Sequence, residues 1–310
     1  MSKYNPTPYP CIAICTFQRP QGLLLLLQSI AAQEGVERCP LVIVVDNSID
    51  GGAEIVCELY TELPMLRYLK QPGGGLVAAR NRAIQELNAQ SAVIFIDDDE
   101  VACSGWYKAF VDGNVRHPDG VLAGPVLPRF EADPPLWITR LGLGVRQQHP
   151  DGATVQMVGD GNTLLPLRFT QDIRLRYDHQ FAFSGGQDTD LFIRWKKLGG
   201  SIYWVERAIV IENVPPSRMT ATYAISRDMW DAASYTTISS RTWGGKAWAV
   251  ARLPYYVGQG VMFFLASMLM LRRDYLVRAG MKFGRVLGVV RSFLGLLPNR
   301  FLAAQDDVSR

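Results

Sequence analysis

Several features that would assign this 310-residue sequence to a common class of protein are missing from it. Its five cysteines include no CxxC pair and are odd in number, which suits a reducing compartment better than a disulfide framework. The net charge of +3 is small for a dedicated nucleic-acid-binding protein. The N-terminal stretch MSKYNPTPYP has no apolar run of the kind found in secretory signals. We therefore expect a cytoplasmic location and no nucleic-acid partner.

Two common phosphate-binding fingerprints, GxGxxG and GxxxxGK[ST], are also missing. The sequence has instead three consecutive glycines, Gly73, Gly74 and Gly75, before a predicted helix over residues 76–88. Backbone N–H groups at such a helix start can hold a phosphate, and Arg80 would add positive charge near a diphosphate. The alternative is a plain surface loop followed by an exposed basic turn.

Hydrophobic residues make up 48% of the chain, which is enough for a substantial core. Short apolar runs alternate with helical stretches in the N-terminal part, and this alternation predicts a doubly wound, mostly parallel α/β sheet. The predicted strands cover residues 11–15, 41–45, 66–69 and 93–97, and the predicted helices between them cover 22–32, 53–63 and 76–88.

Four acids, Asp97-Asp98-Asp99-Glu100, directly follow the apolar run at 93–96. In open α/β sheets, ligands bind just beyond the carboxyl ends of the strands. Because side chains alternate along an extended chain, Asp97 and Asp99 would face the same way. Two carboxylates aimed at one place repel unless a cation lies between them, and Mg²⁺ or Mn²⁺ with a bound phosphate suits that place. An acidic turn exposed to water is the simpler alternative.

A second acidic motif, GGQDTD at 185–190, begins a predicted amphipathic helix. Asp188 stands at the start of that helix, after two glycines. The positive end of the helix dipole favours an anion there, so this carboxylate could simply cap the helix. The Asp188 carboxylate could equally be a reactive group. The local pattern does not decide between a helix cap and a reactive group.

Taken in order, these motifs resemble those of the family 2 glycosyltransferases, which have the GT-A fold. The resemblance covers residues 11–218. The matching stretches are 14–20 (ICTFQRP), 44–48 (VVDNS), 75–81 (GLVAARN), 97–99 (DDD) and 185–191 (GGQDTDL). Their order along the chain makes the resemblance specific. It implies a Rossmann-like, mostly parallel sheet with helices on both faces.

The resemblance also implies a binding site for a nucleotide-diphosphate sugar. The residues that would bind the nucleotide sugar are Thr16, Arg19, Asp46, Asn47, Gly75, Arg80, Asp97 and Asp98. Asp46 would contact a uracil base, which favours UDP. Asp97 and Asp99 would hold Mg²⁺ or Mn²⁺, and Asp188 corresponds to the family's catalytic base.

Two positions depart from the family pattern. Gln187 stands where most members have glutamate, so one contact on the acceptor side would be neutral. Asn213 stands where many members have a metal-binding histidine, and an amide oxygen is a weaker ligand for a transition metal. Trp137 and Asn162 lie between the motifs and are further candidates for the acceptor side.

The implied reaction moves one sugar from a UDP-sugar to a hydroxyl group. Asp188 would take the proton of that hydroxyl, and a single base opposite the leaving group implies inversion at the anomeric carbon. The cation would stabilise the diphosphate as a Lewis acid. A nucleotidyltransferase is one alternative, although the basic loop that it needs is missing near the N-terminus. A catalytically weak GT-A scaffold protein of a membrane polysaccharide-assembly complex is the other.

The last third of the chain has a different character. Residues 253–271 include no charged residue and approach the length that spans a bilayer. Basic residues lie on both sides, Arg252 before and Arg272 after, which argues against a simple crossing under the positive-inside rule. Residues 276–294 alternate basic and apolar side chains, as in helices that lie on an anionic leaflet.

We therefore expect a GT-A catalytic domain over 1–220 and a helical membrane-attachment region over 221–310. The attachment would be monotopic or re-entrant, at the cytoplasmic face of the inner membrane. By analogy with the bacterial enzymes that the chain resembles, the acceptor would be a saccharide on polyprenyl diphosphate, for exopolysaccharide or O-antigen assembly. The sequence leaves oligomerisation open.

Overall fold

The computed structural model describes residues 8–87, 92–242 and 244–296. The chain forms two compact units, each described by itself. The first consists of Met1–Pro128, Arg146–Ala182 and Gln187–Glu212, and the second of Arg129–Val145, Phe183–Gly186 and Asn213–Arg310. The expected domain boundary at residue 220 stays a prediction.

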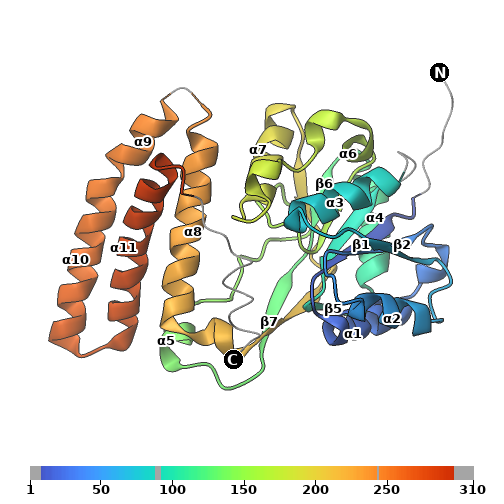
Figure 1. Ribbon diagram of the computed structural model, residues 1–310, viewed down its shortest axis with the longest axis horizontal. Coiled ribbons are helices and arrows are strands. Elements are labelled where there is room, and N and C mark those ends of the chain that lie inside the picture. The colour runs from blue at the N-terminus through green and yellow to red at the C-terminus, as the bar shows by residue number, and fades with distance from the viewer. Residues whose placement is uncertain (1–7, 88–91, 243, 297–310) are drawn as a thin grey trace. The chain divides into compact units, whose positions relative to one another are not determined.

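A seven-stranded sheet forms the centre of the first unit, with the strand order β3-β2-β1-β4-β8-β6-β9 (Figure 1). Its strands are β1 (Cys11–Thr16), β2 (Val42–Asp46), β3 (Leu66–Lys70), β4 (Val93–Asp97), β6 (Val121–Ala123), β8 (Thr163–Leu165) and β9 (Ile202–Trp204). The pairs β1–β2, β1–β4, β2–β3 and β6–β9 are parallel, whereas β8 runs antiparallel to both of its neighbours. The predicted mostly parallel sheet is confirmed.

Helices cover both faces of this sheet, which explains why its strands are apolar on both sides. They are α1 (Pro20–Ala31), α2 (Gly52–Leu59), α3 (Gly75–Glu86), α4 (Trp106–Arg116), α6 (Arg168–Gln171) and α7 (Gln187–Lys197). Successive residues of β1 belong to different cores: Ala13 packs with α3 residues such as Ala83, and Ile12 packs with α1 residues such as Leu23. All four residues are fully buried.

The carboxyl ends of three strands meet at one edge of the sheet. The register pairs Thr16 with Asp46 and Cys15 with Asp97, so β1, β2 and β4 end side by side. Each of these strands therefore delivers a polar residue to the same edge, which is where open α/β sheets bind their ligands.

A second, three-stranded sheet has the order β5-β10-β7. It consists of β5 (Glu100–Ala102), β7 (Val126–Phe130) and β10 (Val210–Val214). Strand β10 continues through the polar residues Glu212 and Asn213 to Val214. Glu212 pairs with Glu100 across the antiparallel β5–β10 ladder, and backbone pairing of this kind overrides the weak strand preference of polar residues.

The second unit is helical. It contains α5 (Leu136–Leu141), α8 (Ala221–Ser239), α9 (Gly245–Ala251), α10 (Leu253–Met270) and α11 (Arg273–Phe293). Helices α8 and α11 pack closely because Gly280 and Gly284 of α11 lie against Ile225 of α8. Arg285 of α11 makes two hydrogen bonds of 2.7 Å to Asp228 of α8. The helices expected within the last third of the chain are present.

Candidate active site

The acidic turn after β4 is held in place by the end of β1. Asp98 is buried, and its carboxylate accepts hydrogen bonds from Thr16 Oγ1 (2.9 Å) and Arg19 Nη1 (2.9 Å). Arg19 Nη1 also donates to Asp99 Oδ2 at 3.0 Å. Burial raises the pKa of Asp98 to about 6, and the Arg19 guanidinium opposes this rise. Asp98 thus organises the turn, while Arg19 is half exposed beside it.

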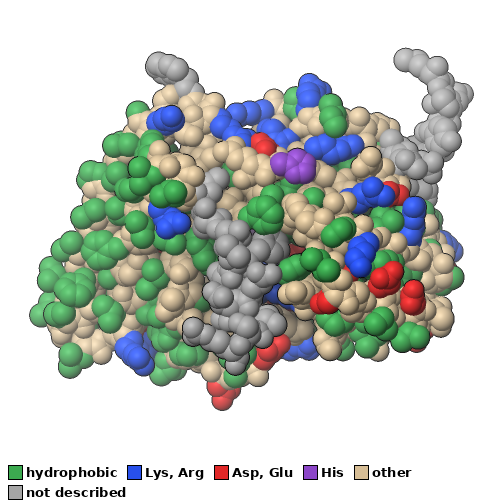
Figure 2. Space-filling model, in the orientation of Figure 1, with side chains coloured by type: hydrophobic (Ala, Val, Ile, Leu, Met, Phe, Trp, Pro, Cys, Tyr) green, Lys and Arg blue, Asp and Glu red, His purple; other side chains and the backbone are tan. Residues whose placement is uncertain are grey.

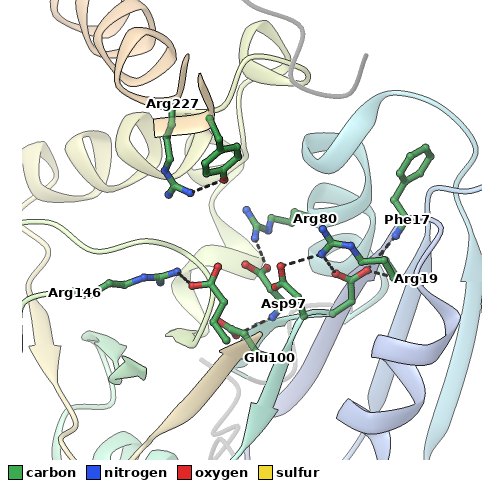
Figure 3. Close-up of polar contacts among 12 residues, drawn as sticks. Phe17, Arg19, Arg80, Asp97, Glu100, Arg146 and Arg227 are labelled. Carbon is green, nitrogen blue, oxygen red and sulfur yellow. Dashed lines mark hydrogen bonds and ion pairs between the residues drawn. The ribbon is translucent and has the colours of Figure 1, made fainter. Parts of the chain in front are cut away.

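Arg80 lies inside the first unit rather than on its surface. Its residue exposure is 1%, and its guanidinium packs over the rings of Phe95 and Tyr177. Nη2 donates to Asp97 Oδ1 at 2.9 Å, and Nη1 is paired with Asp160. In Figure 3 the dashed lines from Arg19 and Arg80 reach the acidic turn from two sides. The position fits a residue that orients Asp97 better than one that contacts a diphosphate directly.

Two more groups surround Asp97 on its other side. The buried Glu100 accepts the Asp97 backbone N–H through Oε2 at 3.1 Å. Burial, and then the negative charges of Asp97 and Asp99, raise the pKa of Glu100. Gly161 lies so close that a Cβ added there would be 2.6 Å from Asp97 Oδ2. The Asp97 carboxylate is therefore oriented by contacts from several segments of the chain.

The close approach of Gly161 gives a test of this arrangement. We expect Gly161→Ala to displace Asp97 or the loop that carries Gly161, because Arg80 already holds the other carboxylate oxygen. Metal-dependent nucleotide affinity should fall about tenfold, as overpacking of a dense site costs about 1–3 kcal/mol. Isothermal titration with UDP and Mn²⁺ measures the change. Gly258→Ala is the control, since a Cβ at Gly258 meets open space; equal affinities for both variants would contradict the prediction.

The ends of β2 and the glycine loop form the next part of the site. Asn47 Nδ2 donates to the carbonyl oxygens of Gln71 and Gly73, and so ties the loop to β2. Three consecutive glycines have φ between 62° and 81°, a left-handed backbone that explains why glycine stands there. The loop leads into α3 at Gly75, whose preceding residue offers no side-chain cap. Uncapped N–H groups at a helix start can receive an anion.

Asp46 is fully buried, with both carboxylate oxygens in use. Oδ1 accepts the Ser48 backbone N–H at 2.8 Å, and Oδ2 accepts the Tyr68 hydroxyl at 3.0 Å. The predicted contact with a uracil base stays a prediction. Each carboxylate oxygen can accept a second hydrogen bond, so the contact requires access to this buried side chain rather than loss of the Tyr68 bond.

Asp188 lies in the wall of a pocket of about 350 Å³ in the first unit. Its Oδ1 accepts the Thr189 backbone N–H at 2.7 Å. A Cβ added at Gly159 would lie 3.8 Å from Asp188 Oδ2 and 3.9 Å from Arg146 Nη1. Both side chains therefore approach the same glycine. Gly161 lines the pocket as well, so one short loop separates Asp188 from Asp97. Arg146 is held by a 2.8 Å hydrogen bond to Glu212 Oε2. Figure 3 shows the dashed line that leaves the labelled Arg146 side chain.

The three candidates for the acceptor side have different surroundings. Asn162 is fully buried, and its amide donates to the carbonyl oxygens of Pro125 and Ala208 and accepts from Trp106 Nε1. This position in the core does not fit an acceptor contact. Gln187 is buried at the start of α7, next to Asp188. Trp137 belongs to the second unit, where it packs against an apolar cluster around Ile138.

Asn213 also belongs to the second unit. Its Oδ1 accepts a 2.9 Å hydrogen bond from Arg129 Nε. This bond occupies one of the two lone pairs of the amide oxygen and holds a positive guanidinium beside it, which makes the oxygen a weaker ligand for a cation.

The acidic turn has the chemistry that a hard divalent cation requires. Asp97 and Asp99 stay partly exposed, while Asp98 is enclosed by its hydrogen bonds. Within the described ranges no three His, Cys, Asp or Glu side chains converge as a closed metal site. In Mg²⁺-type binding, one or two carboxylates hold the ion, and phosphate and water oxygens complete its shell. The residues fit such an ion.

Sequence reasoning missed two residues of this site. Asp160 pairs with Arg80, and burial raises its pKa to about 7 against the opposing charge of Arg80. Arg146 brings a guanidinium into the pocket beside Asp188. For Asp160, the only sequence feature that could have predicted a role is the cluster of turn residues at 158–163. For Arg146, no local sequence feature predicts one.

Comparison with characterised proteins gives one curated relative and several solved structures. The relative is the succinoglycan biosynthesis protein ExoM of Rhizobium meliloti (strain 1021), which is 27% identical over 258 residues, or 80% of this chain and 81% of that one. A mannosyltransferase from Pyrobaculum calidifontis, solved with GDP-mannose and Mn²⁺, has a TM-score of 0.63 and 14% identity over 94% of this chain and 90% of its own.

A second structure, GalNAc-T7 with UDP, GalNAc and Mn²⁺, has a TM-score of 0.52 and 14% identity. The match covers 74% of this chain but only half of the length of that one. At these identities the structures show the fold alone, which is GT-A-like. The model of glycosyl transferase family 2 matches residues 11–174, more than half of the chain. The chain therefore belongs to glycosyl transferase family 2, and it is a glycosyltransferase.

Proposed function

We propose that this glycosyltransferase is metal-dependent and inverting, and that it moves one sugar from a UDP-sugar to a lipid-linked saccharide. One observation carries the proposal. A pocket large enough for a sugar has Asp188 in its wall and, through Gly161, touches the acidic turn at Asp97. A base and a candidate metal site thus lie on two sides of one short loop.

Asp97 and Asp99 would hold the cation. When bound, it supplies Lewis-acid stabilisation of the diphosphate leaving group. The solved structures with Mn²⁺ support a metal-dependent reaction, and Mg²⁺ or Mn²⁺ both suit oxygen ligands. Arg80 orients Asp97 by its 2.9 Å hydrogen bond, so that Asp97 presents its other oxygen to the site.

Asp188 is the proposed general base. Its Oδ1 is held by the Thr189 N–H, which leaves Oδ2 to receive the proton of the acceptor hydroxyl. A single base supports one displacement and therefore inversion at the anomeric carbon. Proton NMR of the product, with both donor and product anomers assigned, tests this directly; retained configuration would contradict it.

The donor is proposed to be a UDP-sugar because Asp46 occupies the position at which the family has an aspartate that contacts the uracil base. The solved neighbours bind UDP in one case and GDP-mannose in another, so they support a nucleotide-diphosphate sugar without choosing the base. Thr16, Arg19 and Asn47 would shape the nucleotide site through the contacts described above, and Gly75 would offer its N–H to phosphate.

The acceptor is proposed to be a saccharide carried on polyprenyl diphosphate. The name of the curated relative supports a place in polysaccharide assembly. The apolar and basic helices of the second unit support attachment to the cytoplasmic face of the inner membrane, in a monotopic or re-entrant manner. A membrane-held enzyme with a soluble donor is suited to an acceptor that is itself in the membrane.

The decisive experiment is binding of UDP and of GDP, each with and without Mg²⁺ or Mn²⁺, to the wild-type protein and to Asp99→Ala. We expect metal-dependent UDP binding that the substitution weakens at least tenfold, because one of two carboxylate ligands is lost. Asp119→Ala is the control, because it removes an exposed acid that lies outside the acidic turn.

The outcomes separate the candidate functions. Metal-dependent GDP binding in place of UDP binding would correct the donor and retain the mechanism. Failure to bind either nucleotide with any metal would contradict the catalytic proposal and favour the scaffold protein, to which Gln187 and Asn213 already give some support.

A further inference from the structure

Helix α10 has an apolar face that the described residues of its own unit leave uncovered. Only 17% of the most apolar window of Gly245–Met270 is buried, and this stretch is long and apolar enough to cross a membrane. The exposed side chains follow helical spacing along one side: Tyr255, Val261, Met262, Leu265, Met268 and Leu269. Figure 2 shows hydrophobic side chains gathered over α10. A core helix would be mostly buried. The exposure of this face indicates that it contacts something other than its own unit.

The opposite side of α10 is packed along its length against α11. The Phe263 and Tyr275 rings stack at 6.2 Å near the turn between the helices, and Gly260 lies against the Phe283 ring further along. Arg285 lies 5.8 Å from the Tyr256 ring near the start of α10. The two helices therefore form one antiparallel hairpin (Figure 1).

This hairpin argues against a crossing of the bilayer. The α11 partner carries charged residues throughout, namely Arg273, Asp274, Arg278, Lys282, Arg285 and Arg291. Arg285 is moreover paired with Asp228 of α8, so α8 is bound to α11 as well. A span by α10 would carry these charges into hydrocarbon, where each is costly. An α10 that lies in the plane of the interface keeps them in water or among headgroups.

The charge around the face favours anionic lipid over a second copy of the chain. Residues 244–296, the described stretch that forms α9, α10 and α11, contain eight lysines and arginines but one acid, Asp274. That acid is buried and paired with Arg272. Basic residues stand at both ends of α10, with Arg252 before it and Arg272 after it, where they would meet headgroups. Two copies of such a surface would repel each other.

We propose that the exposed face of α10 is a lipid-docking surface, on which the helix lies parallel to an anionic leaflet. This deepens the proposed attachment by naming the element, its orientation and the lipid charge that it needs. Trp248 and Tyr255 are exposed near the start of the helix, and such amphipathic rings favour the headgroup level. The surface would hold the enzyme beside acceptors that are confined to the same leaflet.

The test uses the full-length protein in flotation assays with phosphatidylcholine vesicles, with and without phosphatidylglycerol. We expect binding that depends on phosphatidylglycerol and weakens with salt. The double variant Leu265→Glu/Leu269→Glu should bind at least tenfold more weakly. The matched control is Leu59→Glu/Val115→Glu, which charges two exposed apolar residues of the first unit and should bind as wild type does. Circular dichroism confirms that both variants are folded.

Three results would overturn the proposal. Equal binding to both kinds of vesicle would remove the anionic requirement. Resistance to extraction from native membranes by alkaline carbonate would indicate a spanning helix. A concentration-dependent dimer that the α10 variant abolishes, without vesicle binding by the wild type, would identify a second copy as the partner. Metal-dependent UDP binding by the same proteins is read separately, so failure of the proposed function and failure of the docking surface are distinguishable.

Discussion

Asp188→Asn should abolish sugar transfer while it leaves nucleotide binding nearly unchanged. The substitution keeps the size of the side chain and an oxygen that can accept the Thr189 N–H, so the start of α7 should be retained. It removes the carboxylate that would take the acceptor proton. General-base catalysis contributes about 10²–10⁴-fold, and we expect a loss of kcat in this range. Transfer from radiolabelled UDP-sugar and titration of UDP with Mn²⁺ measure the two quantities on the same preparation.

The neighbouring acid on α7 is the matched control for this prediction. Asp190 is buried and accepts a 2.8 Å hydrogen bond from Arg194 Nε, four residues along the helix. Asp190→Asn should therefore lower the melting temperature and leave kcat of the folded protein within a few-fold of wild type. Equal losses of kcat in both variants would show that the helix, and not the Asp188 carboxylate, sets the rate. Full activity of Asp188→Asn would contradict its assignment as the base.

The sheet and its active edge could be predicted because their signals are local. The apolar runs at 11–15 and 93–96 are buried on both faces, as continuous runs indicate, and their strands end in Thr16 and Asp97 at the same edge. A motif that directly follows a buried parallel strand must lie at the carboxyl edge of the sheet, where ligands bind. Another local signal predicts α10, because a long apolar run without charged residues indicates a helix of nearly membrane-spanning length.

The remaining parts of the site depend on contacts between distant segments. Asp160 pairs with Arg80 across 80 positions, and no local pattern indicates a partner so far away. Asn162 illustrates the opposite error, since a polar residue among turn residues suggests exposure. It is instead fully buried with φ of 55°, and its amide joins the carbonyls of Pro125 and Ala208 to Trp106. Asparagine tolerates this backbone and supplies both donors and an acceptor, which explains the choice of residue.

Arg80→Leu should be the most destabilising single substitution in the first unit that we consider. Arg80 is 1% exposed, and its guanidinium is the shared partner of Asp97 and Asp160. Removal of one member of a buried ion pair costs about 3–5 kcal/mol, because the other charge stays buried without compensation. Urea unfolding followed by circular dichroism measures the free energy of unfolding. Arg82→Leu on the same helix is the control; its arginine is partly exposed and paired with Glu86, and such surface pairs contribute about 1 kcal/mol or less.

The pH dependence of this loss tests its cause. Burial raises the pKa of Asp160 to about 7, whereas its ordinary value is 3.8, and the Arg80 charge opposes that rise. The folded protein therefore binds this proton more tightly than the unfolded chain does, so the group's contribution to stability falls as pH rises from about 4 to about 7. Without Arg80 the pKa goes higher, and the fall continues above pH 7 by up to about 1.4 kcal/mol per pH unit. We expect the stability difference between wild type and Arg80→Leu to be larger at pH 8 than at pH 6. An equal difference at the two pH values would show that lost packing against Phe95 and Tyr177, rather than an unpaired Asp160, is what the substitution costs.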